Sequence, residues 1–572
     1  MSGAWQNGLF ALPCGADFAG AFAQGLIGRM RGRPPQDMAR VTVYANSGQT
    51  LNALREALVA RGPLILPELR LIADLGGPAA APVLARRLEL ARLVEAVLRA
   101  RPDLAQGQSV PRLAESLSAL MAEMQLEGLG PEALERIEPA EHAQHWARAL
   151  AFLRIAAGYH LSGPPQDREA LQRARAEALA AAWARGEDLP PGPVVVAGST
   201  GSHGATRAFM RAVARLPMGA VVLPGFDAEL PDAVWQGLEA IEDHPQSRHA
   251  AFLAEFGRPL PWTDDAPADP VAPTDPPPGP APAPAPPPAP ERTRARLVSL
   301  ALRPAPVTDQ WIAEGPALGG LVAPTAGLTL IEAAQPREEA EALALLIREA
   351  IGRGQAVTLI AADRMLTRRV QSALDRWGII PDDSAGQPLS LTAPGLFLRH
   401  LADLFGADLL LDGLVELLKH PVTATGLGPD WRREHLRHSR ELELHLRAHG
   451  PAFPDGAALL AWAARAPDPA ARPWAEWLAP LVDRMVALGA ERAPAPPARR
   501  LAMLRALAED LAAGPGGLAE ASELWARSPG GVARATMDHL AAHVGLAPAL
   551  GPADFRDLLL AELQSQALRQ DV

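Results

Sequence analysis

The chain has 572 residues, a formal net charge of −11, 48% hydrophobic and 21% charged residues, and a single cysteine, Cys14. This length suffices for about three or four domains, and the composition is that of a globular protein. One cysteine excludes an internal disulfide, an iron–sulfur cluster held by four thiolates and a cysteine-rich zinc site. The acidic balance excludes a protein that binds DNA with its whole surface, although a local basic channel is compatible with it.

The sequence contains no sign of a membrane protein. No stretch reaches the roughly 18 apolar residues of a spanning helix, and the start, MSGAWQNGLFALPCGADF, has no basic segment followed by a long apolar one. We therefore expect no signal peptide, no membrane partner and a cytoplasmic location. Lys419 is the one lysine, and the other 53 basic residues (54 minus 1) are arginines, so any chemistry that needs a lysine can be checked at one position.

Residues 1–260 are predicted to form a first α/β domain. Apolar strands are expected at 9–12 and 41–44, and PVVVAG (193–198) and AVVLPG flank an amphipathic helix, ATRAFMRAVARLP. Strands that alternate with helices indicate a parallel sheet, and continuous apolar runs are typical of strands buried on both faces. From about 64–190 the apolar residues recur every three or four positions, which predicts a large helical insertion.

A linker is predicted at 261–292, where the sequence WTDDAPADPVAPTDPPPGPAPAPAPPPAP is rich in proline and alanine. Proline lacks an amide donor, so such a run favours polyproline II and acts as a semi-rigid spacer.

Residues 293–395 are predicted to begin a second α/β domain, with strands at 328–333, 356–362 and 378–380 and a helix after each of the first two. Residues 396–572 are predicted to form a helical subdomain. Within it, VELLKHP indicates a helix that ends at Lys419 and His420, and the histidine-rich run HLRHSRELELHLRAH predicts a solvated helix face in preference to a metal site.

The loop after the first strand contains Pro13, Cys14, Gly15, Ala16 and Asp17. A phosphate-binding P-loop needs several glycines, a lysine for the phosphates and a Ser or Thr for magnesium. This loop has one glycine and neither a lysine nor a hydroxyl, and Asp17 would repel a phosphate. We therefore predict a degenerate nucleotide loop and no ATP hydrolysis.

A second loop, GSTGSHGA, begins at the end of the strand PVVVA. A motor ATPase has acidic residues at such a strand end, which hold magnesium and activate water. Ala197 and Gly198 stand there, so we predict a degenerate magnesium-binding strand end. Backbone amides at the next helix could still cradle a phosphate. The simpler interpretation is a turn in which Ser202 or Thr206 caps the helix. We assign no catalytic residue and no metal ligand.

Several segments, taken in order, resemble the AddB family of alphaproteobacteria. GSTGSHGATRAFMRAV and DDSAGQPL are the most specific of them. The segments that carry the resemblance are FALPCGADF (10–18), VTVYANSGQTLNALREAL (41–58), LPELRLIADLG (66–76), VVVAGSTGSHGATRAFMRAVARLPMGAVVLPGFD (194–227), EDHPQ (242–246) and a long run at 338–398.

The resemblance implies two superfamily-1 helicase-like (RecA-like) domains that have lost their motor residues, and a role in double-strand-break repair by homologous recombination. In this family AddB pairs with the motor subunit AddA, which uses ATP, and the complex acts on DNA ends and single-stranded DNA. Full-length family members also carry a C-terminal nuclease domain with an iron–sulfur cluster and Mg²⁺. The chain stops at LLLAELQSQALRQDV without a counterpart of that domain, so we expect a fragment or a truncated product without nuclease activity or a cofactor of its own.

Three functional hypotheses follow. The first is a DNA-handling scaffold in which loops at strand ends contact a single strand. The second is an interaction protein without DNA contact, and the third is an α/β enzyme that binds a phosphorylated ligand. For the first hypothesis the candidate contact residues are Asn46, Ser47, Thr50, Ser199, Thr200, His203, Ser384 and Gln387.

Overall fold

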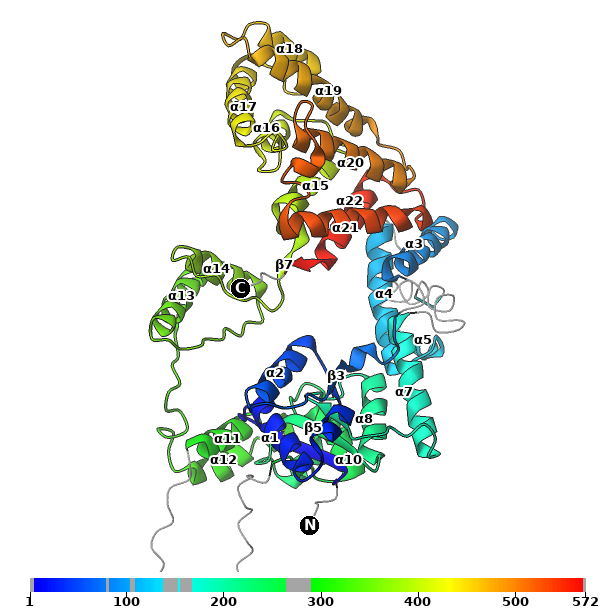
Figure 1. Cartoon of the computed structure of the whole chain (residues 1–572), viewed down its shortest axis with the longest axis vertical. Coiled ribbons are helices and arrows are strands. Elements are labelled where there is room, and N and C mark those ends of the chain that lie inside the picture. Colours follow the sequence, from blue (N-terminus) through cyan, green and yellow to red (C-terminus); the bar gives the residue numbers. More distant parts are fainter. Residues whose placement is uncertain are drawn as a thin grey trace, which may run out of the picture. The chain divides into compact units, whose positions relative to one another are not determined.

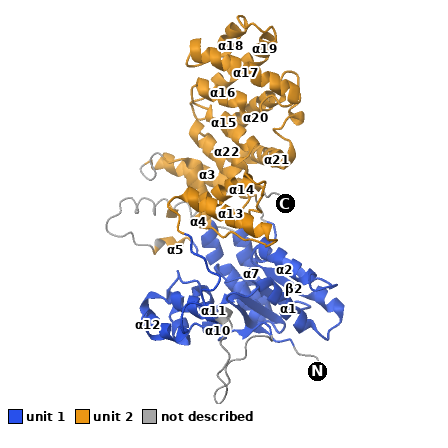
Figure 2. Cartoon of the chain, turned by 90° about the vertical axis from the view of Figure 1, so that its left-hand side faces the viewer, with its two compact units in different colours: residues 1–80, 122–130, 163–331 blue, residues 81–121, 131–162, 332–572 orange. Residues whose placement is uncertain are grey.

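The computed structural model divides the chain into two compact units (Figure 1). Unit 1 contains residues 1–80, 122–130 and 163–331, and unit 2 contains residues 81–121, 131–162 and 332–572 (Figure 2). Helices dominate, and one sheet of parallel strands lies among them, which confirms the predicted helix-rich α/β class. The described residues are 5–78, 82–102, 108–136, 153–154, 167–263 and 290–568.

Unit 1 is built on a six-stranded parallel sheet with the order β3-β2-β4-β5-β1-β6. The predicted strands at 9–12, 41–44 and 193–198 and AVVLPG are confirmed, whereas β3 and β6 are strands that the sequence did not predict. Both are short and partly exposed edge strands, so they lack the apolar run that marks the buried ones. The strands are β1 (Gly8–Pro13), β2 (Thr42–Ala45), β3 (Glu68–Leu71), β4 (Val194–Ala197), β5 (Gly219–Phe226) and β6 (Leu260–Pro261).

Helices cover both faces of this sheet (Figure 1). Side chains alternate along a strand, so Phe10 of β1 packs with Phe22 and Leu54 on one face while Leu9 packs with Phe209 on the other. The first face is covered by α1 (Phe18–Met30) and α2 (Gly48–Val59), and the second by α7 (Arg168–Ala184), α8 (Gly204–Arg215) and α10 (Ser247–Phe256). Unit 1 also contains α9 (Asp232–Trp235), α11 (Pro290–Ala301) and α12 (Gln310–Glu314).

The linker predicted at 261–292 begins later than expected. Pro261 belongs to β6, and Trp262 is buried, with its indole nitrogen donating to the Phe22 carbonyl at 3.0 Å. The ring also stacks on Phe22, which ties the segment after β6 to the start of the chain. Residues 264–289 of the predicted linker lie outside the described residues, and helix α11 already begins at Pro290.

Unit 2 is mainly helical, and one extended hydrophobic core joins its helices. Leu84 and Leu88 of α3 (Val83–Ala100) belong to this core together with Phe397, Trp474 and Phe555. The helical segment predicted at 64–190 is therefore divided, because α3 packs in unit 2 whereas α7 packs in unit 1. The other helices that contribute to this core follow residue 392, and they are α15 (Ala393–Asp403), α16 (Leu411–Lys419), α17 (Pro429–His449), α18 (Gly456–Ala463), α19 (Ala471–Ala490), α20 (Pro497–Ala513), α21 (Arg527–His543) and α22 (Pro552–Ser565).

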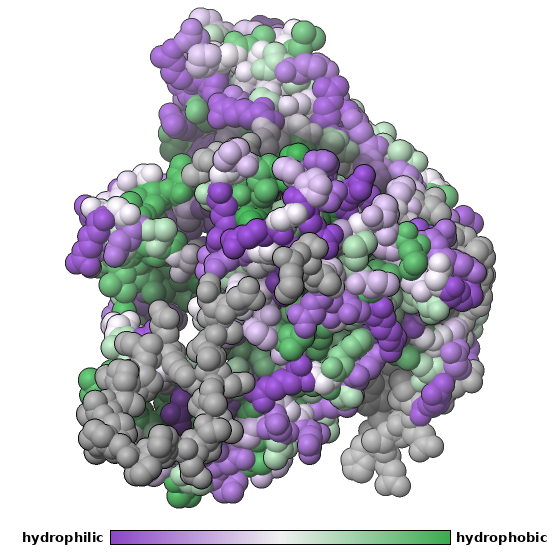
Figure 3. Space-filling model, turned by 60° about the horizontal axis from the view of Figure 1, so that its bottom comes forward, coloured by the Kyte–Doolittle hydropathy of each residue, from purple (hydrophilic) through white to green (hydrophobic). Residues whose placement is uncertain are grey.

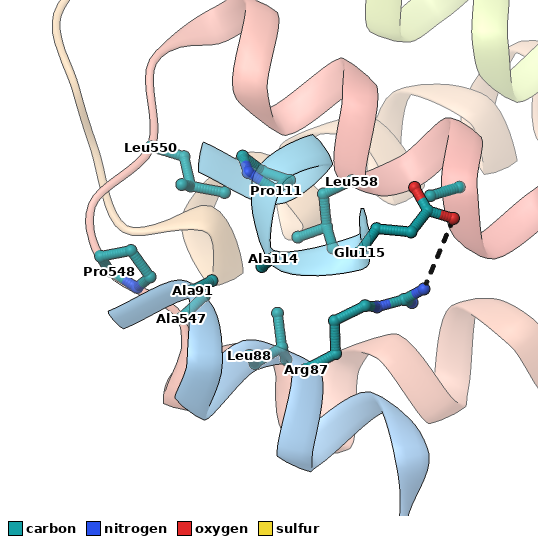
Figure 4. Close-up of a pocket in the computed structure, with 11 residues that line it drawn as sticks. Arg87, Leu88, Ala91, Pro111, Ala114, Glu115, Ala547, Pro548, Leu550 and Leu558 are labelled. Atoms are coloured by element: carbon teal, nitrogen blue, oxygen red, sulfur yellow. Dashed lines mark ion pairs between the residues drawn. The ribbon is translucent and has the colours of Figure 1, made fainter. Parts of the chain in front are cut away.

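A small pocket in unit 2 lies among α3 (Val83–Ala100), α4 (Val110–Glu127) and the residues around Leu550 (Figure 4). Most of its lining is apolar, and Arg87 provides the positive charge. The Arg87 guanidinium is already matched, since it pairs with the buried Glu562 and lies 4.0 Å from Glu115. The charge of this pocket is thus satisfied within the chain. Short α5 (Glu132–Glu135) follows α4.

The three strands predicted at 328–333, 356–362 and 378–380 do not form. The helices between them are present as α13 (Pro336–Gly352) and α14 (Arg364–Asp375), which pack against each other through a small apolar cluster. Leu330 is 84% exposed and Ile360 92% exposed, so these apolar runs have no described sheet to join. On the face of the molecule drawn in Figure 3, apolar side chains lie among hydrophilic ones. The second parallel sheet expected in 293–395 is accordingly not seen among the described residues, where β7 (Gln387–Pro388) pairs instead with β8 (Ala567–Leu568) in antiparallel register.

Candidate nucleic-acid interface

The carboxyl ends of β2 and β4 form the candidate binding site of unit 1. These strands are neighbours, yet α2 after β2 and α8 after β4 lie on opposite faces of the sheet. Two adjacent loops that diverge to opposite faces mark the position at which open parallel sheets bind their ligands, so this edge of the sheet is the candidate site. The predicted contact residues of unit 1 follow these two strands.

Gly198 is the point at which the loops converge. Its φ angle of +75° is in the left-handed region that favours glycine. A β-carbon built on it would lie 3.0 Å from Thr50 Cγ2, 3.3 Å from the Phe18 ring and 3.6 Å from Asn46 Oδ1. The structure therefore brings the degenerate strand end together with two of the predicted contact residues.

The predicted residues on these loops differ in what they offer to a ligand. Asn46 is exposed, and Thr200 and His203 are half-buried. Ser47 is engaged because its hydroxyl accepts a hydrogen bond from the Thr50 amide at 3.2 Å and caps α2. Ser199 is only 4% exposed, and its hydroxyl accepts from a backbone amide within the turn, so it belongs to the loop's own structure.

A carboxylate that the sequence did not point to caps helix α8. The Gly204 amide donates to Glu127 Oε1 at 2.9 Å, and Arg207 Nη2 donates to the other oxygen at 2.8 Å. His203 Nδ1 lies 3.8 Å from the same carboxylate. The cap expected from Ser202 or Thr206 is therefore wrong. No local pattern could have revealed Glu127, since 77 positions separate it from Gly204.

Another carboxylate occupies the start of α1. Asp17 Oδ1 accepts from the Gly20 amide at 3.1 Å, and this capped turn follows directly from the exposed loop Pro13, Cys14, Gly15 and Ala16. A P-loop would hold its phosphate at this helix N-terminus, where backbone amides and the helix dipole favour an anion. In this chain the Asp17 carboxylate is the anion at that position.

The helices that follow β1, β2 and β4 thus share one property. Their N-termini are capped by Asp17, Ser47 and Glu127, so the backbone amides nearest the sheet's carboxyl edge are already partly satisfied. A bound phosphate would have to displace a carboxylate at two of these three places. This arrangement suits contacts from loop side chains better than a nucleotide cradle.

The ends of β1 and β5 are tied by side-chain hydrogen bonds. Cys14 Sγ donates to the Gly225 carbonyl at 3.0 Å, and Gln246, from the segment EDHPQ, donates to the same carbonyl at 2.9 Å. Partial burial and the nearby Asp227 carboxylate raise the pKa of the Cys14 thiol. A thiol with a raised pKa is a poor nucleophile at neutral pH, so this cysteine has a structural role here.

Two predicted contact residues belong to unit 2, whereas the other six belong to unit 1. Ser384 is exposed. Gln387 is the first residue of β7, and its side-chain amide donates to the Leu391 carbonyl at 3.2 Å.

The histidine-rich run of α17 is not the solvated face that we predicted. His435 and His438 are buried at 0% and 1% exposure. The Trp474 indole donates to His435 Nδ1 at 3.2 Å, and His435 Nε2 lies 2.8 Å from the Leu418 carbonyl. Burial lowers the pKa of His435 to about 4, so the ring is a neutral core residue. The predicted helix end at Lys419 and His420 is confirmed.

Within the described ranges, no group of three or more His, Cys, Asp or Glu residues is arranged to hold a metal ion. In the same ranges no helix is long and apolar enough to cross a membrane. No known family model and no curated protein matches the chain.

Proposed function

We propose that the chain is the helicase-like part of a non-motor, AddB-type subunit that handles single-stranded DNA during double-strand-break repair by homologous recombination. The observation that supports it best is the carboxyl edge of the unit 1 sheet. This edge has the site geometry of a parallel-sheet nucleotide-binding domain, yet Asp17 and Glu127 occupy the places where phosphates would sit. Such a domain can present loops to DNA without using ATP.

Under this proposal the partner is an AddA-type motor subunit, which binds and hydrolyses the ATP. In the family that the chain resembles, the iron–sulfur cluster and Mg²⁺ belong to the nuclease domain, and no residue of this chain is proposed to bind either of them. The complex would act in the cytoplasm, where chromosomal DNA ends arise in bacteria. DNA would reach unit 1 at Asn46, Thr200 and His203, whose side chains are at least partly accessible at the carboxyl ends of β2 and β4.

The alternative of an enzyme for a phosphorylated ligand is less well supported. Its strongest argument was the loop GSTGSHGA, but Glu127 caps the helix that follows this loop. An interaction protein without DNA contact is the remaining alternative, and the DNA-binding experiment decides between it and the proposal.

The test is the affinity of the full chain for a fluorescent oligothymidylate, measured by anisotropy at several salt concentrations. The triple variant Asn46→Ala, Thr200→Ala, His203→Ala should bind about tenfold more weakly, equivalent to about 1.4 kcal/mol. Gln36→Ala is the matched control, because Gln36 is exposed and precedes β2, away from the strand's carboxyl end. Binding that is unchanged in the triple variant would refute these loops as the contact site.

A further inference from the structure

Helix α14 has a group of exposed arginines that form no ion pair with a described residue. Arg364, Arg368, Arg369 and Arg376 are all exposed, and no ion pair joins any of them to a described residue. Residues 364–376 contain these four arginines and one acidic residue, Asp375. On a chain with a net charge of −11, this helix is a local concentration of positive charge.

The arginines lie on the solvent side of a firmly anchored helix. Val370, Ala373 and Leu374 are buried on the opposite side, where they pack against Ala340 and Ala344 of α13. Arg364 and Arg368 are four residues apart, which places their β-carbons about 5–6 Å from each other along one side of the helix. These two arginines therefore share one side of the helix, and Arg369 and Arg376 lie further round its solvent-exposed surface.

Trp377 follows these arginines in the sequence, and its ring makes cation–π contacts with two guanidinium groups. The Arg348 Cζ lies 4.6 Å and the Arg376 Cζ 5.0 Å from the centre of its ring. A cation–π contact uses the flat face of a guanidinium, so N–H donors on its edge stay available, whereas a salt bridge consumes them. Trp377 itself is half-buried, so part of its ring is accessible.

Helix α17 shows that this pattern is not general for arginine-rich helices of the chain. Its Arg433 pairs with Asp430, Arg437 pairs with three carboxylates, and Arg447 pairs with Glu443 and Asp412. Arg433, Arg437 and Arg447 of α17 thus use their donors within the protein, whereas Arg364, Arg368 and Arg369 of α14 have no ion-pair partner among the described residues.

We propose that the α14 arginine surface, formed by Arg348, Arg364, Arg368, Arg369 and Arg376, binds the phosphate backbone of single-stranded DNA. This inference rests on the proposed function and adds a second contact region, in unit 2. Guanidinium groups match phosphate oxygens in bidentate geometry, and an accessible aromatic ring among basic side chains is the combination that single-strand binders use for backbone and base. An acidic peptide would need the charge but not the tryptophan.

The experiment compares two triple variants of the full chain that lose the same charge. The first variant removes three charges from α14 and carries Arg364→Gln, Arg368→Gln and Arg369→Gln. The matched control removes three charges from α17 and carries Arg433→Gln, Arg437→Gln and Arg447→Gln. Affinity for oligothymidylate is measured by anisotropy against salt concentration, and melting temperatures verify that each variant folds. If three phosphate contacts are lost, the slope of log affinity against log salt should decrease by about 2, at roughly 0.7 per phosphate. Binding at low salt should weaken at least about tenfold in the α14 variant and stay near the parent value in the control.

The outcomes separate this inference from the proposed function. A parent chain that binds DNA and an α14 triple variant with an unchanged salt slope would overturn the inference and leave the function standing. An equal loss in the α17 control, or equally tight binding of polyglutamate to the parent chain, would also overturn it. A parent chain with no affinity for oligothymidylate would remove both. The Trp377→Ala variant lacks the ring that contacts Arg348 and Arg376. A loss of affinity for oligothymidylate in this variant, smaller than that of the α14 triple variant, would support the inference.

Discussion

Strand β4 and the segment 356–362 have similar apolar sequences, VVVA and AVTLIAA, and different structures. In β4 every residue is at most 4% exposed, because β2 and β5 flank it and helices cover both faces. In the second segment Ile360 is 92% exposed and no strand forms. An apolar run becomes a strand only where a neighbouring strand can pair with its backbone, and sequence periodicity alone does not report that partner.

The largest expected effect comes from placing a charge in each of these segments. Val196→Asp buries an unpaired carboxylate in the centre of the sheet and should cost more than about 4 kcal/mol of unfolding free energy. Ile360→Asp exposes its carboxylate to water and should change stability by no more than about 0.5 kcal/mol. Urea unfolding of the two variants and the parent chain measures both effects.

The same two variants test whether β4 and residues 356–362 differ in burial as the structure shows. If Ile360→Asp destabilised the chain as strongly as Val196→Asp, residues 356–362 would have to be buried in solution. A Val196→Asp chain of normal stability would contradict the position of β4 in the sheet.

A smaller effect per residue is expected from acid, and it should differ between the two units. Burial lowers the pKa of His249 in unit 1, and of His420 and His435 in unit 2, from 6.5 to about 4. The unfolded chain binds a proton on each of these histidines below about pH 6.5, whereas the folded chain stays neutral until about pH 4. Stability is therefore lost as the pH falls through this window, by up to about 3 kcal/mol for each histidine.

Unfolding free energies measured between pH 7 and pH 4.5 test this expectation. Replacing His435 with Gln should reduce the pH dependence by the equivalent of one proton, although it also lowers stability at neutral pH. An unaltered pH dependence in the His435→Gln variant would show that this histidine is protonated in the folded chain.

The sequence predicted the sheet of unit 1 well, because its central strands are buried on both faces and read as continuous apolar runs. It missed β3, whose residues are only partly buried, and β6, which has two residues. It also expected a solvated His435 and His438, since their polar character hides the hydrogen bonds and ring contacts that bury them. Local periodicity identifies elements, whereas burial of a polar side chain depends on partners far along the chain.

The candidate site was predictable in part for the same reason. Strand ends marked the loops around Asn46 and Thr200, and the missing lysine and hydroxyl marked the degenerate loop at Asp17. The cap from Glu127 could not be predicted, because it comes from a helix 77 residues earlier. The arginines of α14 were visible in the sequence, but only their lack of carboxylate partners in the structure distinguishes them from those of α17.

The most direct test of the account is whether the chain binds a nucleotide at the carboxyl edge of its sheet. Thermal unfolding of the full chain should be measured with increasing concentrations of Mg–ATP, since a ligand that binds only the folded state raises the melting temperature. The caps provided by Asp17 and Glu127 predict an unchanged melting temperature throughout the titration. A melting temperature that rises with nucleotide concentration would contradict the account, because a phosphate would then displace a carboxylate that the structure places there.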